Sequence, residues 1–348
     1  MKKEINLVAL IPIDIWIFSA FVMAIIISCS DKDPINAPIG IPVIATSEVT
    51  VTAETSAQCG GNITSNGGAT VTACGVCWST SPMPTIEDNL TNEGSGTGDF
   101  VSDIVGLSKF TTYFVRAYAT NSAGTGYGDT VSFTAGKGSV TDIDGNTYQT
   151  VIIGNQWWMA ENLKVTRYRN GDKIPIVTDN VTWAGLSTGA YCNYDNDELH
   201  IETYGRLYNW YAVDDNRNIA PLGWHVPTDE EWKQLEMYLG MNQSDADNTH
   251  WRGTEEGGKL KEDGTTHWLS PNIGATNESG FTALPGGIRG NFGYFYSIGS
   301  YAGFWSSTKN SSTTSTYRYL DSDQSKIGRW ISNYVYNQDG FSIRCVKD

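Results

Sequence analysis

Residues 146–159 have the sequence Asn-Thr-Tyr-Gln-Thr-Val-Ile-Ile-Gly-Asn-Gln-Trp-Trp-Met, which carries the plainest folding signal in this chain. β-branched and aromatic residues fill both halves, and the Gly154-Asn155 pair separates them. Such a pair between two strand-like runs is typical of a tight hairpin turn. We therefore expect strands over 146–153 and 156–159, and β structure around them.

The hairpin opens a tryptophan-rich segment, because ten of the 12 Trp residues lie between Trp157 and Trp330. The chain has 348 residues, 37 Gly and 18% charged residues, a composition that favours β and loop-rich structure over a helical bundle or coiled coil. At about 150 residues per domain, two folded units are expected. The shift in composition places the second of them at 138–348.

Two helices are predicted in this second domain. The segment 228–231 reads Thr-Asp-Glu-Glu, a capping box in which the first hydroxyl accepts from the amide three residues later. The apolar residues that share the next helical face are Trp232, Leu235 and Leu239. Gly240 can end this helix. A second helix, or a turn of helix, is expected over 204–213.

The segment 44–136 has the pattern of a β-sandwich. Short β-branched runs are separated there by clusters of Gly, Asn and Ser. About ninety residues of such strands suffice for two packed sheets. The expected strands include 49–52, 69–72, 113–118 and 130–133.

Three cysteines fall in the sandwich segment. Asn66-Gly67 predicts a hairpin turn, and folding the chain about it places Cys59 opposite Cys74. A cross-strand disulfide between them is expected in an exported protein. Cys77 is left as a buried thiol, since no second pair accompanies the Cys74-x-x-Cys77 spacing that a zinc site would need.

The N-terminus is predicted to carry an export signal. Lys2 and Lys3 precede an apolar run over 7–27, which predicts a signal peptide over 1–28. Its ending resembles a lipoprotein signal, in which the next residue, Cys29, is acylated and holds the protein in a membrane. The alternative is an uncleaved anchor helix. A Pro-rich tether is expected over 29–43.

The charge of the chain argues against nucleic acid as a partner. Subtracting 38 acidic from 23 basic residues gives a net charge of −15, which repels phosphate backbones.

The signal and the acidic segment 30–33 after Cys29 resemble those of surface-displayed lipoproteins of the bacterial outer membrane. The expected location is therefore the cell envelope, facing outward.

The sandwich segment resembles a fibronectin type III domain. Leu107 is followed by Tyr113 and by the run 115–124, Val-Arg-Ala-Tyr-Ala-Thr-Asn-Ser-Ala-Gly, which is similar to the tyrosine-corner strand of that family. The resemblance implies a spacer or a protein-contact module. Catalysis is not expected there.

From about residue 140 onward the chain resembles the Fibrobacter succinogenes major paralogous domain. The similar blocks are 144–148, 157–163, 204–210, 223–228, 280–289 and 341–346. The resemblance implies a loop-rich α+β fold similar to C-type lectins and to formylglycine-generating enzymes. It also implies a surface or secreted protein with a binding or adhesion role.

The resemblance to formylglycine-generating enzymes raises the question of whether the thiols of this domain bind a metal. Formylglycine-generating enzymes bind copper through two thiols, and this domain has only Cys192 and Cys345. Copper, a structural disulfide and two buried free thiols are the alternatives, of which the disulfide is preferred. The four His residues form no recognisable catalytic triad motif, and His225 is expected in the core. No catalysis is assigned.

Oxygen-rich loops offer alternative places for one structural Ca²⁺. Asp142, Asp144 and Asn146 alternate as ligands do in calcium loops, but a turn is preferred there, because Gly145 is misplaced for an EF-hand and no Glu follows at the twelfth position. The segments 195–198 and 321–323 also carry carboxylates.

Exposed aromatic rings are the expected ligand face, since Trp and Tyr combine flat apolar faces with a polar edge. The candidates in the Gly-, Ser- and Asn-rich loops are Trp251, Trp268, Tyr294, Phe295, Tyr296, Trp305 and Trp330. We expect a lipid-anchored, non-catalytic domain that binds extracellular glycan or protein. The alternatives are a copper-dependent enzyme of the formylglycine-generating type and a purely structural envelope component.

Overall fold

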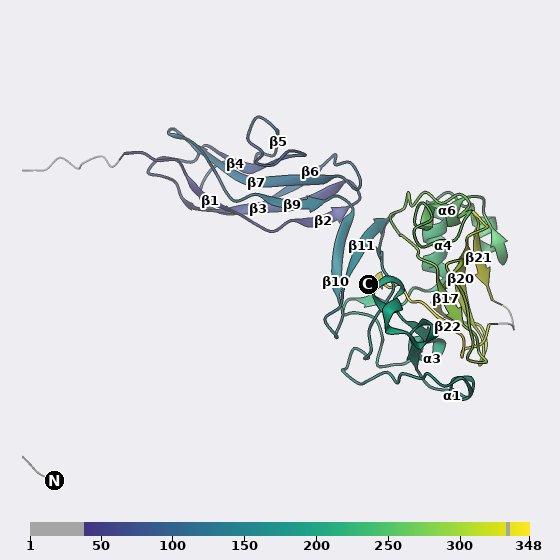
Figure 1. Ribbon diagram of the computed structural model, residues 1–348. Helices are drawn as coiled ribbons and strands as arrows, with labels where there is room; N and C mark the ends of the chain where they lie inside the picture. Colours follow the sequence, from purple (N-terminus) through teal and green to yellow (C-terminus); the bar gives the residue numbers. More distant parts are fainter. Residues whose placement is uncertain (1–37, 332–334) are drawn as a thin grey trace, which may run out of the picture. The chain divides into compact units, whose positions relative to one another are not determined.

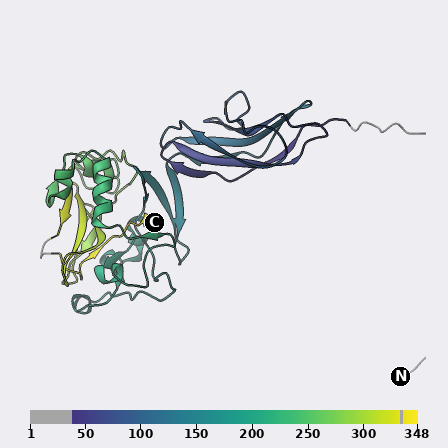
Figure 2. The same cartoon turned by 180° about the vertical axis from the view of Figure 1, so that it is seen from behind.

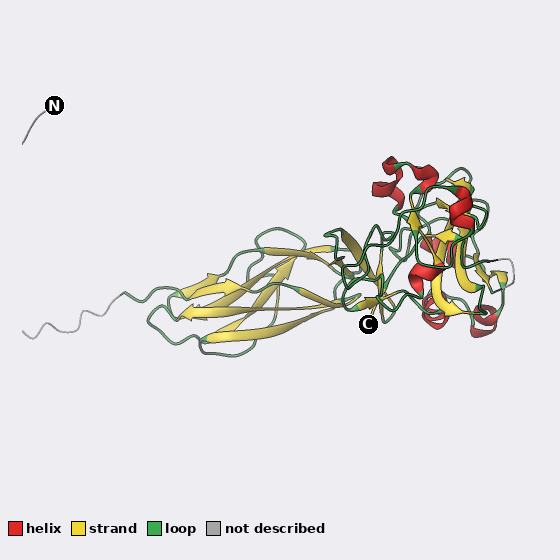
Figure 3. Cartoon of the chain, turned by 90° about the horizontal axis from the view of Figure 1, so that it is seen from below, coloured by secondary structure: helices red, strands yellow, loops and turns green. Residues whose placement is uncertain are grey.

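The computed structural model describes residues 38–331 and 335–348 (Figure 1). The predicted signal peptide 1–28, its Cys29 and the first part of the tether 29–43 lie outside the described residues. The described chain is mostly β, and its helices all follow residue 179 (Figure 3). None of the helices within the described ranges is long and apolar enough to cross a membrane.

The N-terminal domain is a β-sandwich. Its strands are β1 (Val43–Thr46), β2 (Thr50–Ala53), β3 (Ser56–Ser65), β4 (Ala73–Ser79), β5 (Asn89–Leu90), β6 (Gly98–Val105), β7 (Thr112–Asn121), β8 (Gly124–Tyr127) and β9 (Val131–Thr134). One sheet has β3 at its centre, between β6 and the pair β1 and β2. The other sheet centres on β4 and β7, with β5 beside β4, and β8 and β9 along β7.

Strand β7 shows why this segment folds as a sandwich. Four of its buried side chains alternate along the strand and pack between the sheets: Tyr113, Val115, Ala117 and Ala119. The Tyr113 hydroxyl accepts a hydrogen bond from the Ser108 amide at 3.0 Å. This bond closes the corner before β7, so the predicted tyrosine corner is confirmed.

The hairpin predicted at Asn66-Gly67 is wrong. A turn does form there, since the Ala69 amide donates to the Asn66 carbonyl at 3.4 Å, but β3 and β4 belong to different sheets. Val71 is buried where the chain crosses from one sheet to the other, and 69–72 is not a strand. Cys59 and Cys74 are consequently free buried thiols, and the predicted disulfide between them is wrong.

The C-terminal domain contains two further sheets. Its strands are β10 (Lys137–Thr141), β11 (Thr147–Ile153), β12 (Gln156–Met159), β13 (Tyr191–Cys192), β14 (Leu207–Asn209), β15 (Trp224–His225), β16 (His250–Arg252), β17 (Gly286–Arg289), β18 (Phe295–Ile298), β19 (Tyr301–Lys309), β20 (Ser315–Asp321), β21 (Ile327–Trp330), β22 (Gly340–Phe341) and β23 (Val346–Lys347). One sheet has the order β10-β11-β12-β23-β15. The other has the order β13-β14-β22-β17-β19-β20-β21-β16, with β18 paired to β17. The predicted hairpin over 146–159 is confirmed as β11 and β12.

Short helices accompany these sheets. They are α1 (Asn180–Ala184), α2 (Ile201–Tyr204), α3 (Trp210–Val213), α4 (Asp229–Tyr238), α5 (Gln243–Asp247) and α6 (Glu256–Leu260), with 3-10 turns at Tyr194–Asn196 and Glu198–His200. The capping box predicted at 228–231 is present and begins α4. Helix α4 lies beside β19, β20 and β21 in opposite views of the domain (Figures 1 and 2).

The helix or turn of helix predicted over 204–213 is present only as one turn, α3 at Trp210–Val213. Helix α2 ends at Tyr204 because Gly205 has a φ of 73°, which turns the chain out of the helix. Strand β14 follows, and Asn209 then caps α3 by accepting from the Ala212 amide at 3.2 Å.

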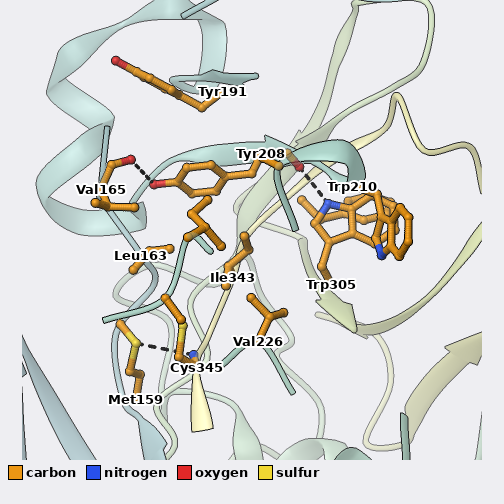
Figure 4. Packing of buried hydrophobic residues seen from close by; sticks show 14 of the residues in the cluster. Met159, Leu163, Val165, Tyr191, Tyr208, Trp210, Val226, Trp305, Ile343 and Cys345 are labelled. Atoms are coloured by element: carbon orange, nitrogen blue, oxygen red, sulfur yellow. Dashed lines mark hydrogen bonds between the residues drawn. The ribbon is translucent and has the colours of Figure 1, made fainter. Parts of the chain in front are cut away.

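The core of the C-terminal domain joins segments that are far apart in the sequence (Figure 4). The Tyr208 hydroxyl donates to the Val165 carbonyl at 2.7 Å, and the Trp305 indole donates to the Tyr208 carbonyl at 2.7 Å. Cys345 lies beneath this layer, where its amide donates to the Met159 sulfur at 3.4 Å. Buried rings are thus fixed by hydrogen bonds as well as by packing.

Candidate functional site

Two of the tryptophans predicted for the ligand face belong to the core. Trp268 is 1% exposed and Trp305 is 0% exposed. Their indole N–H groups donate to the carbonyls of Ala283, at 2.9 Å, and Tyr208, at 2.7 Å. Small polar residues flank both tryptophans in the sequence, but the two rings pack inside the core clusters of the domain. The prediction for both is wrong.

Trp251 and Trp330 remain partly exposed and are brought together. Their ring centroids lie 4.2 Å and 6.2 Å from that of Tyr319, which stands between them on β20. Gly328 makes room for this arrangement, since a Cβ there would lie 1.8 Å from the Tyr319 ring. The two predicted residues therefore share one aromatic edge of the larger sheet.

Tyr294 and Tyr296 are exposed, by 58% and 48%, in the β17–β18 hairpin. Phe295 points the other way and contacts Tyr194, with ring centroids 5.3 Å apart. The predicted ligand face is therefore not one surface. It divides into the aromatic edge, the hairpin and two core residues.

The structure instead assembles a series of rings that the sequence did not indicate. Successive centroids in the order Phe295, Tyr194, His200, Tyr204, His267 lie 5.3, 5.7, 6.0 and 6.0 Å apart. We call these five residues the ring row. Tyr194 is buried and anchors it, whereas His200, Tyr204 and His267 are partly exposed. Leu199, 85% exposed, lies next to His200 in the chain.

The ring row ends at a cavity of about 320 Å³, which we call the polar pocket. Its lining comes from separate parts of the chain: Ala160, Glu161, Asn162, Lys164, Glu202, Thr203, Gly205, His267, Thr282 and Leu284. Several of these residues belong to blocks 157–163, 204–210 and 280–289. Blocks that were recognised separately in the sequence therefore meet at one place.

Arg344 holds the floor of the polar pocket together. Its guanidinium donates to Asn162 Oδ1 at 2.8 Å, to the Thr282 carbonyl at 2.8 Å and to the Phe281 carbonyl. Asn162 in turn donates to the Tyr204 carbonyl at 2.8 Å. Burial lowers the pKa of Arg344 to about 9, against the opposing charge of Glu161, so the group remains a cation at neutral pH.

The wall of the polar pocket carries charges of both signs. Lys164 Nζ lies 3.0 Å from Glu202 Oε1, and His267 Nδ1 lies 2.8 Å from Glu262 Oε1. Glu161 accepts from the Gln149 amide at 2.6 Å. Carboxylates, an ammonium, an amide and hydroxyls at one opening are suited to hydrogen bonding with a hydroxyl-rich ligand.

The carboxylates considered for Ca²⁺ have other partners. Asp142 accepts from two amides, from the Asn146 side chain and from the Tyr148 hydroxyl, which makes its segment a turn. In the 321–323 segment, Asp321 Oδ1 accepts from the Asp323 amide at 3.1 Å and from the Ser322 hydroxyl at 3.4 Å. No group of three His, Cys, Asp or Glu side chains able to hold a metal occurs among residues 38–331 and 335–348.

Cys192 and Cys345 do not come together, so the disulfide predicted between them is wrong. Cys192 packs with Trp183, and Cys345 with Met159, in different clusters of the core. Their strands also differ, because β13 pairs with β14, whereas β23 pairs with β12 and β15. Burial raises the pKa of Cys192 to about 12, so this thiol is protonated at neutral pH.

His225 is half-buried rather than in the core, which corrects its expected place. Its Nε2 lies 2.8 Å from Glu231 Oε1, and its Nδ1 lies 2.7 Å from Asp348 Oδ1. These two carboxylates raise its pKa above the usual value, with burial opposing them. With both ring nitrogens engaged, His225 serves to join β15 to the first turn of α4.

The comparisons with known proteins separate the two domains. The model of the Fibrobacter succinogenes major domain family matches residues 151–347, which confirms the resemblance seen in the sequence blocks. No curated protein matches the chain.

Solved structures that are similar to the chain include fibronectin type III domains, as the sequence predicted for the sandwich. One is the sixth such domain of human fibronectin type III domain containing protein 3, with 26% identity, covering 28% of this chain and 82% of that one, at a TM-score of 0.20. Another human fibronectin III domain has 19% identity, covers 30% of this chain and 92% of that one, and has a TM-score of 0.22. The sensor domain of an anti-sigma factor from Pseudobacteroides cellulosolvens has 17% identity, covers 28% of this chain and 96% of that one, and has a TM-score of 0.22.

Proposed function

Because this chain belongs to the Fibrobacter succinogenes major domain family, we propose that its C-terminal domain is a recognition module displayed at the cell surface. The ligand is an extracellular glycan that lies along the ring row and enters the polar pocket. The observation that carries the proposal is the continuity of three partly exposed rings, His200, Tyr204 and His267, with a pocket of polar side chains.

The chemistry of this site fits a sugar chain. The apolar faces of sugar rings stack on flat aromatic groups, and their hydroxyls both donate and accept hydrogen bonds. Lys164 donates, and Glu161 and Glu202 accept, around the same opening. The surrounding acidic groups and the net charge of −15 favour a neutral glycan over an anionic one.

In this proposal the domain holds its ligand without chemical change. A copper-dependent reaction of the formylglycine-generating type would need two thiols at one site, and Cys192 and Cys345 lie in separate clusters of the core. An acylated Cys29 would fix the protein to the outer membrane, with the tether and the sandwich as spacers. Palmitate labelling of the wild-type protein and of Cys29→Ala tests this anchor.

The glycan site is tested with single substitutions along the ring row. A glycan array is used to select an oligosaccharide, which is then titrated into the full-length protein by calorimetry. Tyr204→Ala should weaken binding by about fivefold, because a stacked ring contributes roughly 1 kcal/mol. Tyr296→Ala, which removes a 48% exposed ring outside the ring row, is the matched control and should bind as the wild type does.

Two outcomes would overturn the glycan proposal. One is an array on which the full-length protein binds no glycan, which would favour a protein ligand or a structural role. The other is binding that Tyr296→Ala weakens and Tyr204→Ala leaves unchanged, which would move the site to the hairpin. Circular dichroism of each variant confirms that the fold is retained.

A further inference from the structure

A second cavity lies apart from the polar pocket, beside the turn that follows β10. It has a volume of about 330 Å³. Its apolar walls are formed by Ile143, Val165, Ile219, Pro221 and Leu222. None of these residues belongs to the ring row or to the polar pocket, so the proposed glycan site does not account for the cavity.

The apolar walls differ in exposure from floor to rim. Val165 is 1% exposed and Ile219 is 2% exposed, so they form a fixed floor. Ile143 and Leu222 are 48% and 82% exposed, so they stand at the rim in contact with water. Apolar side chains that remain exposed around a hollow of this size mark a place where an apolar ligand can displace water.

Arg169 lines the same cavity, and only two of its three guanidinium nitrogens donate hydrogen bonds to described residues. Arg169 Nε donates to the Ala220 carbonyl at 3.2 Å, and its Nη2 donates to the carbonyls of Pro221 and Trp224 at 2.8 and 2.5 Å. Among the described residues its Nη1 has no hydrogen-bond partner, and no acidic side chain forms an ion pair with Arg169. A guanidinium nitrogen carries two N–H donors, which suit a carboxylate.

Asp142 is the acidic residue at the cavity wall, and its two oxygens are hydrogen-bonded within its own turn. Its two oxygens accept from the amides of Asp144 and Asn146, from the Asn146 side chain and from the Tyr148 hydroxyl. These bonds hold the carboxylate within its own turn. The guanidinium of Arg169 is therefore left to an outside anion.

We propose that this cavity binds a carboxylate carried on a short apolar chain. The carboxylate takes the Nη1 donors of Arg169, and the apolar chain covers Ile143 and Leu222. Two sources share this chemistry: a free medium-chain carboxylic acid, and the C-terminal residue of a peptide that ends in an apolar side chain. Because the protein as a whole has a charge of −15, selection for an anion here has to come from Arg169 itself.

Octanoate titrated into the full-length protein tests the proposal, with 1-octanol as the probe that has the same chain and no charge. Octanoate should bind about tenfold more tightly, as expected for one charge-assisted hydrogen bond. Arg169→Gln should abolish this preference. Leu222→Ser, at a residue 82% exposed and hence harmless to the fold, should weaken octanoate and octanol alike.

Arg167→Gln is the matched control, since Arg167 is an exposed neighbour that pairs with Asp144 at 3.2 Å outside the cavity, and octanoate should bind this variant as it binds the wild type. A dipeptide ending in leucine, compared with its C-terminal amide and with octanoate, identifies the source of the carboxylate. Tighter binding of the dipeptide with a free carboxylate than of octanoate points to a peptide end. Tighter binding of octanoate points to a free acid. Equal binding of octanoate and octanol, or binding of neither probe, overturns the proposal.

Discussion

The sandwich and the C-terminal domain bury different kinds of side chains. In residues 38–136, all of which the structure describes, no charged side chain is buried, and the buried polar residues are Ser102 and Asn121. The C-terminal domain buries several cations almost completely: Arg252, Lys261, Arg289, Arg318 and Arg344. In both domains backbone carbonyls accept hydrogen bonds, but the donors differ between the two domains.

The reason for this difference is the length of the elements. Strands such as β3 and β7 pair along most of their length, so their carbonyls are satisfied by neighbouring strands. The C-terminal domain has short strands and long loops, whose carbonyls need other donors. Arg289 donates to the carbonyls of Val177, Thr178 and Gly293, and Lys261 donates to three more. Buried cations thus replace β ladders in a loop-rich fold.

Removing one of these cations should have the largest effect on stability. Arg318 is 0% exposed and contacts Asp229 Oδ1 at 2.7 Å and Glu236 Oε1 at 2.6 Å. Arg318→Met leaves two buried carboxylates without this partner, which should cost about 3–5 kcal/mol. Urea unfolding followed by tryptophan fluorescence measures it, since ten Trp residues lie in this domain.

The matched control for Arg318→Met is Arg217→Met. Arg217 also pairs with a carboxylate, Asp215 at 2.8 Å, but its side chain is 42% exposed. That change should cost far less than Arg318→Met, because exposed pairs are screened by water. Equal losses for both variants would contradict the role given to buried cations.

The same contrast explains what the sequence could predict. The β11–β12 hairpin, the capping box of α4 and the tyrosine corner at Tyr113 depend on residues close together in the chain, and all three are confirmed. The crossing after Asn66 was missed because the choice of sheet for β4 depends on distant packing. For the same reason the burial of Trp268 and Trp305 cannot be predicted from the residues around them in the chain.

The candidate site was harder to predict than the fold. The blocks around Asn162, Tyr204 and Thr282 were recognised, but their meeting at the polar pocket depends on Arg344, which is remote in the chain from all three. His200 and His267 were considered only for a catalytic triad. Their proximity to Tyr204 appears only once α2 and the loop before Trp268 are placed.

Buried charge should also make the C-terminal domain the pH-sensitive one. Burial raises the pKa of Asp339 to about 7, although the backbone amides of Tyr336 and Asn291 oppose this shift. A carboxyl with a raised pKa in the folded state binds its proton more tightly there than in the unfolded chain. Its contribution is therefore complete below about pH 4 and is lost as the pH rises through 7.

Asp339→Asn should remove this pH dependence, because an amide does not titrate. Between pH 5 and 8 the wild type should lose roughly 2 kcal/mol more than the variant, as measured by urea unfolding at each pH. Asp263→Asn, at an exposed carboxylate, is the control and should retain the wild-type slope. An unchanged slope in Asp339→Asn would show that another group titrates in this range.

The smallest expected effect belongs to the sandwich, where one hydroxyl closes the corner before β7. Tyr113→Phe removes the acceptor of the Ser108 amide, which donates at 3.0 Å, and leaves the packing of the ring in place. The loss should be about 1 kcal/mol and independent of pH between 5 and 8, since no buried charge is involved. Hydrogen exchange read by mass spectrometry should show faster exchange in peptides of β7 and unchanged exchange in those of α4.

Val105→Ala, at a residue 67% exposed on β6, is the control and should leave both unchanged. A loss as large as that of Arg318→Met would mean that the sandwich, despite its long strand pairing, depends on single polar contacts as strongly as the loop-rich domain does.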